Sequence, residues 1–494
     1  MPPSLLEPLP EVFLSNAALA SAVSRAVRAG RLRKLGPRLY TKNTTEPPEA
    51  LVRRHKWIIA GLYFPGAVIV DRTAFDNDVA TDGSLFLASD RESAVALPGL
   101  ILRTRPGAGP LPGDLTFIGG LHLSSPARAY LENLRPARAR GGVARRVGRA
   151  AIERRLDRDL RTRGESYRNE LREDLRRLAP ALGLAAEAKA LDALIGALLG
   201  TREAALVTRV ARARHAGRPY DPKRLDLLGA LRDDLARMAP SSRPDPARPG
   251  ESTNLSFFEA YFSNFIEGTR FELGEARAIV FDGTIPTQRP ADAHDVLGTF
   301  RIVADPTEMR RIPETPEQLT ELLCRRHAVV MQARPEQAPG RFKTAANQAG
   351  STVFVAPDLV HGTLAEGFAL CRTLTDPLQR ATFMMCLISE VHPFSDGNGR
   401  IARIMMNAEL AHAGERRILI PTVYRANYVA ALKGLSHNGL TQPIARVLDF
   451  AQRYTRAIDF TSYDSALAEL RATHAFEEPT EAEERGVRLM LPSP

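Results

Sequence analysis

Residues 392–403 bring together several side chains that could handle a phosphate ester. The segment reads HPFSDGNGRIAR and supplies an imidazole, a carboxylate, an amide, two glycines and two arginines. His392 could accept a proton, and Asp396 could bind Mg²⁺, which commonly takes one protein carboxylate together with phosphate oxygens. Gly397 and Gly399 let the main chain approach an anion without a Cβ clash. The segment therefore points to chemistry on a phosphate group.

The flanking sequence predicts that this segment joins two buried helices. Apolar residues recur at helical spacing on both sides, at Met384, Leu387, Ile388 and Val391 before it and at Ile401, Ile404, Met405 and Ala408 after it. The segment would then open the second helix, whose free N–H groups and partial positive charge suit phosphate. Arg400, Arg403 and Asn407 would share the face of that helix that looks into the site.

The segment resembles the Fic family signature, HxFx(D/E)GNGRxxR, and every specified position is filled. Members of that family transfer a nucleotide monophosphate, usually AMP from ATP, to a hydroxyl side chain of a target protein. The resemblance implies that His392 is the general base, that Asp396 holds Mg²⁺, and that Phe394 anchors the loop in the core. It also implies a set of phosphate and ATP ligands: Gly397, Asn398, Gly399, Arg400 and Arg403. ATP and Mg²⁺ are the expected cofactors.

An amphipathic helix predicted over 252–268 ends in a second family pattern. Ser263-Asn-Phe-Ile-Glu267-Gly268 matches (S/T)xxxE(G/N), with Ser263 and Glu267 on one face and Gly268 as a C-cap. In the family such a glutamate pairs with the second arginine of the motif, here Arg403. It would take the place of the γ-phosphate and restrain transfer. The alternative is an ordinary surface glutamate.

Two further segments resemble parts of the family site. Between 340 and 357, the residues Thr352, Val353, Phe354 and Val355 favour a strand, and the family has a β-hairpin flap here that aligns the target by strand pairing. Ala345-Ala-Asn-Gln348 departs from the β-branched strand of many members. Downstream, 419–428 resembles the segment that closes the adenine side of the pocket, with Tyr428 as the candidate contact.

The N-terminal residues 1–45 predict a winged helix. Helices over 16–20 and 21–29 would precede two short strands around Gly36-Pro37. This segment resembles the winged-helix start of AbiEi-type antitoxin regulators, which implies DNA binding. Arg25 and Arg28 would lie on the recognition helix, and Arg33, Lys34 and Arg38 on the wing. The alternative is a small helical subdomain with a solvated basic face.

The rest of the chain divides by composition into further expected regions. They are an AbiEi-like α/β domain over 46–135, an Arg/Ala-rich helical connector over 136–238, a Pro-rich linker over 239–250, the Fic domain over 251–460 and a C-terminal tail over 461–494. The acidic, Pro-containing residues from Glu477 onward are expected to be frayed. A basic run, Arg138, Arg140, Arg145, Arg146 and Arg149, is expected on a solvated helix. The expected fold is mainly α, with a helical core and a β-hairpin flap.

Composition places few limits on partners. A formal net charge of +10 over 494 residues favours contact with a polyanion. Three cysteines without metal-type spacing, no signal-peptide pattern and no apolar run long enough to span a bilayer predict a cytoplasmic protein.

Three functional hypotheses follow. The first is a protein adenylyltransferase, autoinhibited by Glu267, that modifies a Ser, Thr or Tyr hydroxyl of a target protein or of itself. The second is a DNA-binding, antitoxin-like regulator with a nucleotide-sensing core. The third is removal of AMP, with Glu267 activating water. An intact His392 and Asp396 favour the first, because a binding module needs no base. A homo-oligomer is compatible with each.

Overall fold

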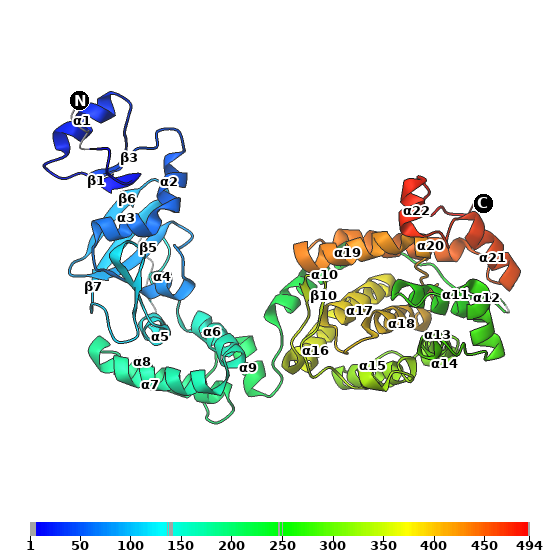
Figure 1. Cartoon of the computed structure of the whole chain (residues 1–494). Coiled ribbons are helices and arrows are strands. Elements are labelled where there is room, and N and C mark those ends of the chain that lie inside the picture. Colours follow the sequence, from blue (N-terminus) through cyan, green and yellow to red (C-terminus); the bar gives the residue numbers. More distant parts are fainter. Residues whose placement is uncertain (1–5, 136, 138–141, 246–247, 249, 493–494) are drawn as a thin grey trace. The chain divides into compact units, whose positions relative to one another are not determined.

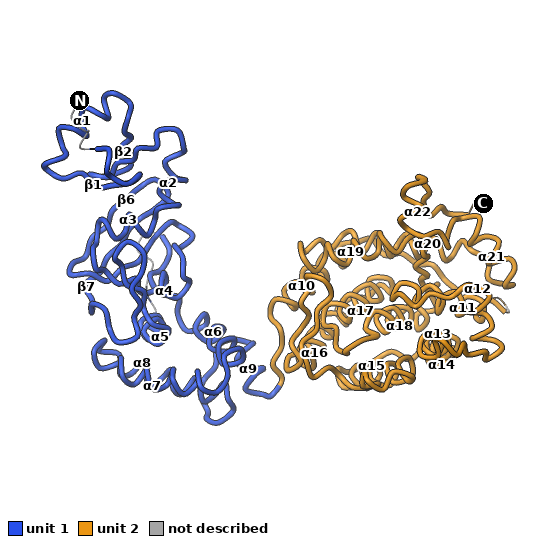
Figure 2. Tube along the Cα trace, in the orientation of Figure 1, with its two compact units in different colours: residues 1–217 blue, residues 218–494 orange. Residues whose placement is uncertain are grey.

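The computed structural model describes residues 6–135, 137, 142–245, 248 and 250–492. By its internal contacts the chain forms two compact units, Met1–Gly217 and Arg218–Pro494 (Figure 2). None of the described helices is both long enough and apolar enough to cross a bilayer.

The N-terminal part of the first unit is a helix on a small antiparallel sheet. It consists of β1 (Val12–Leu14), α1 (Ala20–Arg28), β2 (Arg33–Gly36) and β3 (Leu39–Thr41), with strand order β1-β3-β2. The second predicted helix and the hairpin are confirmed. The predicted helix over 16–20 is wrong: these residues form a turn in which Asn16 Oδ1 accepts from the Leu19 N–H at 3.0 Å. Among residues 6–45, which the structure describes, one helix and not two therefore precedes the hairpin.

A six-stranded mixed sheet with flanking helices follows. Its strands, in the order β6-β7-β5-β4-β9-β8, are β4 (Val68–Ile69), β5 (Ser84–Ser89), β6 (Ser93–Leu97), β7 (Leu100–Pro106), β8 (Leu115–Phe117) and β9 (Leu121–Leu123). The helices are α2 (Pro48–Arg54), α3 (Lys56–Tyr63), α4 (Asp71–Asp76) and α5 (Pro126–Leu134). Strands β4 and β5 are largely apolar and buried, and β7 alternates between buried and partly exposed residues. Strand β8 carries a mostly exposed, mixed sequence.

Four helices complete the first unit: α6 (Arg149–Thr162), α7 (Gly164–Leu182), α8 (Ala185–Leu198) and α9 (Arg209–His215). Leu156, Leu175 and Leu194 are buried in their shared core. Within the basic run, Arg138 and Arg140 lie outside the described residues. Arg145 lies in a bend rather than on a helix, and its guanidinium is 3.4 Å from the buried carboxylate of Asp71. Arg149 forms the expected pair with Glu153 at 3.1 Å.

The second unit is a helical assembly in which α17 and α18 lie in the middle (Figure 1). Its helices are α10 (Pro222–Arg237), α11 (Glu251–Ile266), α12 (Leu273–Arg277), α13 (Pro290–Val303), α14 (Pro306–Met309), α15 (Pro316–Val330), α16 (Val360–Cys371), α17 (Pro377–Val391), α18 (Asn398–His412), α19 (Arg425–Asn438), α20 (Gln442–Ala457), α21 (Tyr463–Ala472) and α22 (Pro479–Glu484). Four of these helices begin with a capping Asp or Thr followed by proline, at Asp221, Asp305, Thr315 and Asp376.

The Pro-rich segment 239–250 was expected to be a linker between domains, but the division falls earlier, after Gly217. Helix α10 buries Leu228, Leu231 and Leu235 in the core of the second unit. The described part of the Pro-rich segment is also fixed to that unit, since Arg243 pairs with Asp449 at 2.6 Å. Two main-chain hydrogen bonds also hold this strap, from the Asp245 N–H to the Gly414 carbonyl at 2.9 Å and from the Arg416 N–H to the Arg243 carbonyl at 2.8 Å.

The residues from Glu477 onward were expected to be frayed, and this is wrong for 477–492, the part that the structure describes. Helices α21 and α22 bury Leu470 and Ala482 in a cluster with residues of α11. The Phe476 ring lies 5.3 Å from the ring of Phe262 on α11. Apolar residues spaced among the acidic ones outweigh the polar composition of this segment.

Candidate active site

The motif loop connects α17 to α18, as predicted, and His392 ends the first of these helices. His392 adopts a left-handed conformation, with φ 52° and ψ 60°. Its ring stacks on the ring of Phe354 at 3.7 Å, and Nδ1 lies 3.4 Å from the Ser389 carbonyl, which leaves Nε2 as the free nitrogen. Burial lowers the pKa of His392 to about 4. The imidazole is therefore neutral near pH 7 and able to take a proton.

The motif loop is held in place by its own Phe394 and Asn398 and by His327 of α15. The Phe394 ring is fully buried and stacks on His327 at 3.8 Å. Asn398 Oδ1 accepts from the Phe394 N–H and its Nδ2 donates to the Phe394 carbonyl, both at 2.8 Å. The Asn398 side chain thus closes the loop by bonding the main chain of Phe394. A phosphate would then be bound by main-chain groups of the loop rather than by the Asn398 amide. His327, which the sequence did not single out, donates from Nε2 to the Asp396 carbonyl at 3.1 Å.

The N-terminus of α18 is where an anion would bind, and the carboxylate of Glu267 already lies there. Gly397 is the N-cap of α18, with φ 75°. A Cβ added to Gly399 would meet Glu267 Oε1 at 2.2 Å and Oε2 at 3.1 Å. The close approach of Glu267 therefore depends on glycine at position 399.

Arg403 is buried and tied to the end of α11. Its Nε donates to Ser263 Oγ at 3.0 Å, and its Nη2 donates to Glu267 Oε1 at 2.7 Å. The pair implied by the resemblance is thus present. Tyr428 is 2% exposed beside Arg403, and burial raises the pKa of its phenol. Its predicted contact with adenine stays a prediction.

Arg400 is held by a carboxylate that the sequence did not reveal. Arg400 Nη1 lies 2.6 Å from Asp295 Oδ2, and Asp295 is fully buried on α13. Arg334 approaches the same Asp295 oxygen at 2.9 Å. Asn407, expected on the face that looks into the site, instead donates to Glu259 Oε1 at 2.8 Å and bonds the main chain of Ile418.

The predicted flap is a short antiparallel hairpin of β10 (Gln348–Ala349) and β11 (Thr352–Val353). The strand predicted over 352–355 stops at Val353, because Phe354 turns onto His392 and Val355 is buried. The Val353 side chain is 61% exposed. Thr352 Oγ1 lies 2.6 Å from His437 Nε2, and Arg224 donates to the Val353 carbonyl at 2.6 Å.

Asp396 is the carboxylate available to a metal ion. Its side chain is 49% exposed and its Oδ2 lies 3.8 Å from Arg400 Nη2. Within the described part of the chain, no group of three His, Cys, Asp or Glu residues could hold a metal by itself. A single half-exposed carboxylate fits Mg²⁺ that takes its other ligands from phosphate and water.

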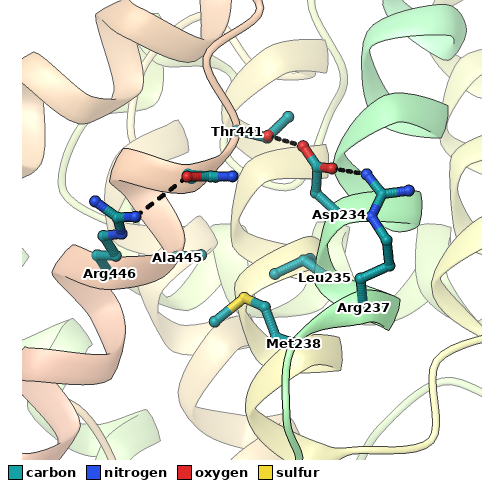
Figure 3. Close-up of a pocket in the computed structure, with 8 residues that line it drawn as sticks. Asp234, Leu235, Arg237, Met238, Thr441, Ala445 and Arg446 are labelled. Atoms are coloured by element: carbon teal, nitrogen blue, oxygen red, sulfur yellow. Dashed lines mark hydrogen bonds and ion pairs between the residues drawn. The ribbon is translucent and has the colours of Figure 1, made fainter.

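A separate pocket of about 280 Å³ lies between α10 and the start of α20 (Figure 3). It is lined by Leu235, Met238, Thr441 and Ala445, with an Asp234–Arg237 pair at its edge. None of its lining residues belongs to the motif loop.

With this geometry in place, comparison with known proteins defines the class of domain. Residues 318–410 match the model of the Fic/DOC family, and this range includes the complete motif loop. The chain therefore carries a Fic domain.

Curated relatives extend the similarity beyond that range. The chain is 30% identical over 274 residues to protein adenylyltransferase fic-1 of Caenorhabditis elegans. The aligned region covers 53% of this chain and 52% of the relative. The chain is 29% identical over 248 residues to the protein of the same name from Caenorhabditis briggsae, covering 49% and 48%. The chain thus spans about half the length of these relatives. A solved structure of C. elegans Fic-1 covers 65% of this chain and 98% of its own, at 21% identity and a TM-score of 0.35.

Proposed function

We propose that this chain is a protein adenylyltransferase held in a restrained state by Glu267. The observation that carries the proposal is the position of the Glu267 carboxylate, over the N-terminus of α18 and 2.7 Å from Arg403. A carboxylate at that place mimics a phosphate in charge and in hydrogen-bonding partners. The same partners, once released, would bind the phosphate chain of ATP.

In the proposed reaction His392 Nε2 takes the proton from a target hydroxyl. The hydroxyl oxygen forms a bond to the α-phosphorus of ATP while the bond from that phosphorus to the oxygen bridging to the β-phosphorus breaks, and pyrophosphate leaves. Arg400, Arg403 and the N–H groups that open α18 bind the phosphate oxygens and stabilise their negative charge. Mg²⁺ held by Asp396 would neutralise further charge on the phosphates.

The flap supports a protein as the target. Strands β10 and β11 make an exposed two-stranded edge, and an extended segment of a target can add to such an edge by main-chain hydrogen bonds. The flap leads directly through Phe354 to His392, so a hydroxyl presented there would lie near the base. A cytoplasmic setting fits the proposal, because it supplies ATP and suits the free cysteines Cys324, Cys371 and Cys386.

Labelling ATP at either the α- or the γ-phosphate tests whether AMP or the terminal phosphate is transferred to protein. The Glu267→Gly protein is incubated with cell lysate, Mg²⁺ and ATP labelled either at the α- or at the γ-phosphate. We expect protein bands labelled from α-labelled ATP and none above background from γ-labelled ATP, because AMP and not the terminal phosphate is transferred. Label from the γ-phosphate alone would mean a kinase and would overturn the proposal.

A second function, DNA binding by the first unit, is proposed on the charge of its N-terminal part. No Asp or Glu occurs between Glu11 and Glu46. Five basic side chains of that stretch are exposed and form none of the ion pairs found among the described residues: Arg25, Arg28, Arg31, Lys34 and Arg38. Such a surface attracts the phosphate backbone of duplex DNA, and binding to it would release counterions. The absence of the first predicted helix leaves the winged-helix docking mode without support.

DNA binding is tested by the salt dependence of the anisotropy of a fluorescent duplex. Replacing Arg25 and Arg28 together with alanine is expected to weaken binding and to reduce the slope of log K against log salt by about one per lost phosphate contact. Arg91→Ala, which removes an exposed charge elsewhere in the first unit, is the control. An unchanged slope in the double variant would remove this surface from DNA binding.

A further inference from the structure

His392 occupies a backbone conformation that a non-glycine residue keeps only where its surroundings impose it. The φ of 52° places it in the left-handed region at the last turn of α17. The His392 side chain is also partly buried, and its surroundings lower its pKa. The groups that contact His392 therefore determine both its backbone conformation and its protonation.

Lys343 holds the main chain on both sides of His392. Its N–H donates to the Pro393 carbonyl at 2.9 Å, and its Nζ lies 3.4 Å from the Val391 carbonyl. One residue outside the motif thus bonds the carbonyl before the base and the carbonyl after it. Such a pair of contacts restrains the peptide units that set the backbone of His392.

Asn347 extends this attachment to the flap. Its Oδ1 accepts from Lys343 Nζ at 2.6 Å, and its Nδ2 donates to the Phe394 carbonyl at 2.9 Å. Its own carbonyl accepts from the Phe354 N–H at 3.3 Å, and Phe354 stacks on His392. Asn347 lies in the Ala345–Gln348 segment, where the sequence departs from the common flap pattern.

The Lys343 ammonium is also a buried positive charge near the base. Lys343 is 5% exposed and takes part in none of the ion pairs among the described residues. Burial lowers its pKa to about 8, so it is largely charged at neutral pH. Lys343 disfavours the imidazolium form of His392, whereas Glu267 and Asp396 favour it. Of the other charged groups nearby, Arg224 pairs with Glu390, and His437 contacts the flap at Thr352.

We propose that Lys343 and Asn347 are positioning residues for His392: they fix its backbone between the flap and the motif loop, and the Lys343 charge adds to burial in disfavouring the protonated base. The role in catalysis rests on the proposed transfer reaction. The effect on protonation does not, because it is a property of the resting protein.

The protonation of His392 is therefore measured first, by NMR titration of histidine-labelled full-length protein, assigned with His392→Gln. Lys343→Met and Asn347→Asp are both expected to raise the pKa of His392, the first by removing a cation and the second by adding a carboxylate beside it. Asn347→Asp changes a partly exposed side chain, so it tests the idea even if Lys343→Met fails to fold. Lys433→Met and Asn438→Asp, at exposed positions on α19, are the matched controls. An unchanged pKa of His392 in the folded variants would overturn the electrostatic role.

Transfer is then measured against pH in the Glu267→Gly background. Activity rises with pH as His392 loses its proton, so a higher pKa moves this acid limb to higher pH. At the plateau, Lys343→Met and Asn347→Ala are expected to lower kcat about tenfold to a hundredfold through misplacement of the base, with the KM for ATP changed less than about twofold. Lys343→Arg should restore the position of the acid limb. If these variants lost ATP binding to the same extent as activity, Lys343 and Asn347 would have a general structural role, and the positioning role would be overturned.

If no variant transfers AMP, including the Glu267→Gly parent, the proposed function fails. The NMR titration would still decide whether Lys343 and Asn347 control the proton affinity of His392.

Discussion

Glycine in place of Glu267 is expected to raise AMP transfer about tenfold to a hundredfold. The carboxylate occupies the anion position over α18 and bonds Arg403 at 2.7 Å, so ATP must displace it to bind productively. Hydrogen bonds to charged groups contribute about 1.5–3 kcal/mol, which corresponds to that range of rate or affinity. Initial rates of incorporation from α-labelled ATP, at several ATP concentrations, measure the effect.

Two further variants make the result specific. Glu314→Gly removes an exposed loop glutamate of the same unit and should leave transfer unchanged. Glu267→Asp withdraws the carboxylate by one methylene and should give an intermediate rate. If Glu267→Gly were no more active than the parent while remaining folded, Glu267 would not be the restraint.

Alanine at position 392 is expected to reduce transfer in the Glu267→Gly background by about a hundredfold to ten-thousandfold, which is the usual contribution of a positioned base. The ring lies outside the set of phosphate-binding groups, so the affinity for ATP should change little. Rates come from the label assay, and ATP affinity comes from calorimetry on the same two proteins.

His412→Ala provides the comparison, since His412 is an exposed histidine at the end of α18. It should transfer AMP at the rate of its parent. A His392→Ala protein that kept more than about a tenth of the parental rate would show that another group accepts the proton.

The part of the site that could be predicted is contiguous in the sequence. The motif loop, its two flanking helices and the N-terminal anion position follow from residues 384–408, where the spacing of apolar side chains fixes the faces of both helices. The contact between Glu267 and Arg403 was foreseen only through family resemblance, because those residues lie far apart in the chain.

The supporting groups could not be predicted, because their role depends on packing between distant elements. Nothing in the sequence distinguishes Asp295 from the other aspartates. Its role is visible only in the structure, where α13 places it against Arg400. Lys343 and Asn347 stand in a segment of weak secondary-structure preference, and their partners lie in the motif loop. Composition also misled at 239–250, where prolines indicated a linker but side-chain pairs fix the strap.

The position of α10 determines which fragment could be studied in isolation. A fragment that starts after the Pro-rich strap would lose Leu228, Leu231 and Leu235, and each such buried leucine stabilises the fold by about 1.5–3 kcal/mol. It would also lose Arg224, whose guanidinium holds the Val353 carbonyl of the flap. Shortening the protein at its most obvious sequence boundary would therefore yield an open apolar face and a loosened flap, whereas a start at Arg218 keeps both intact.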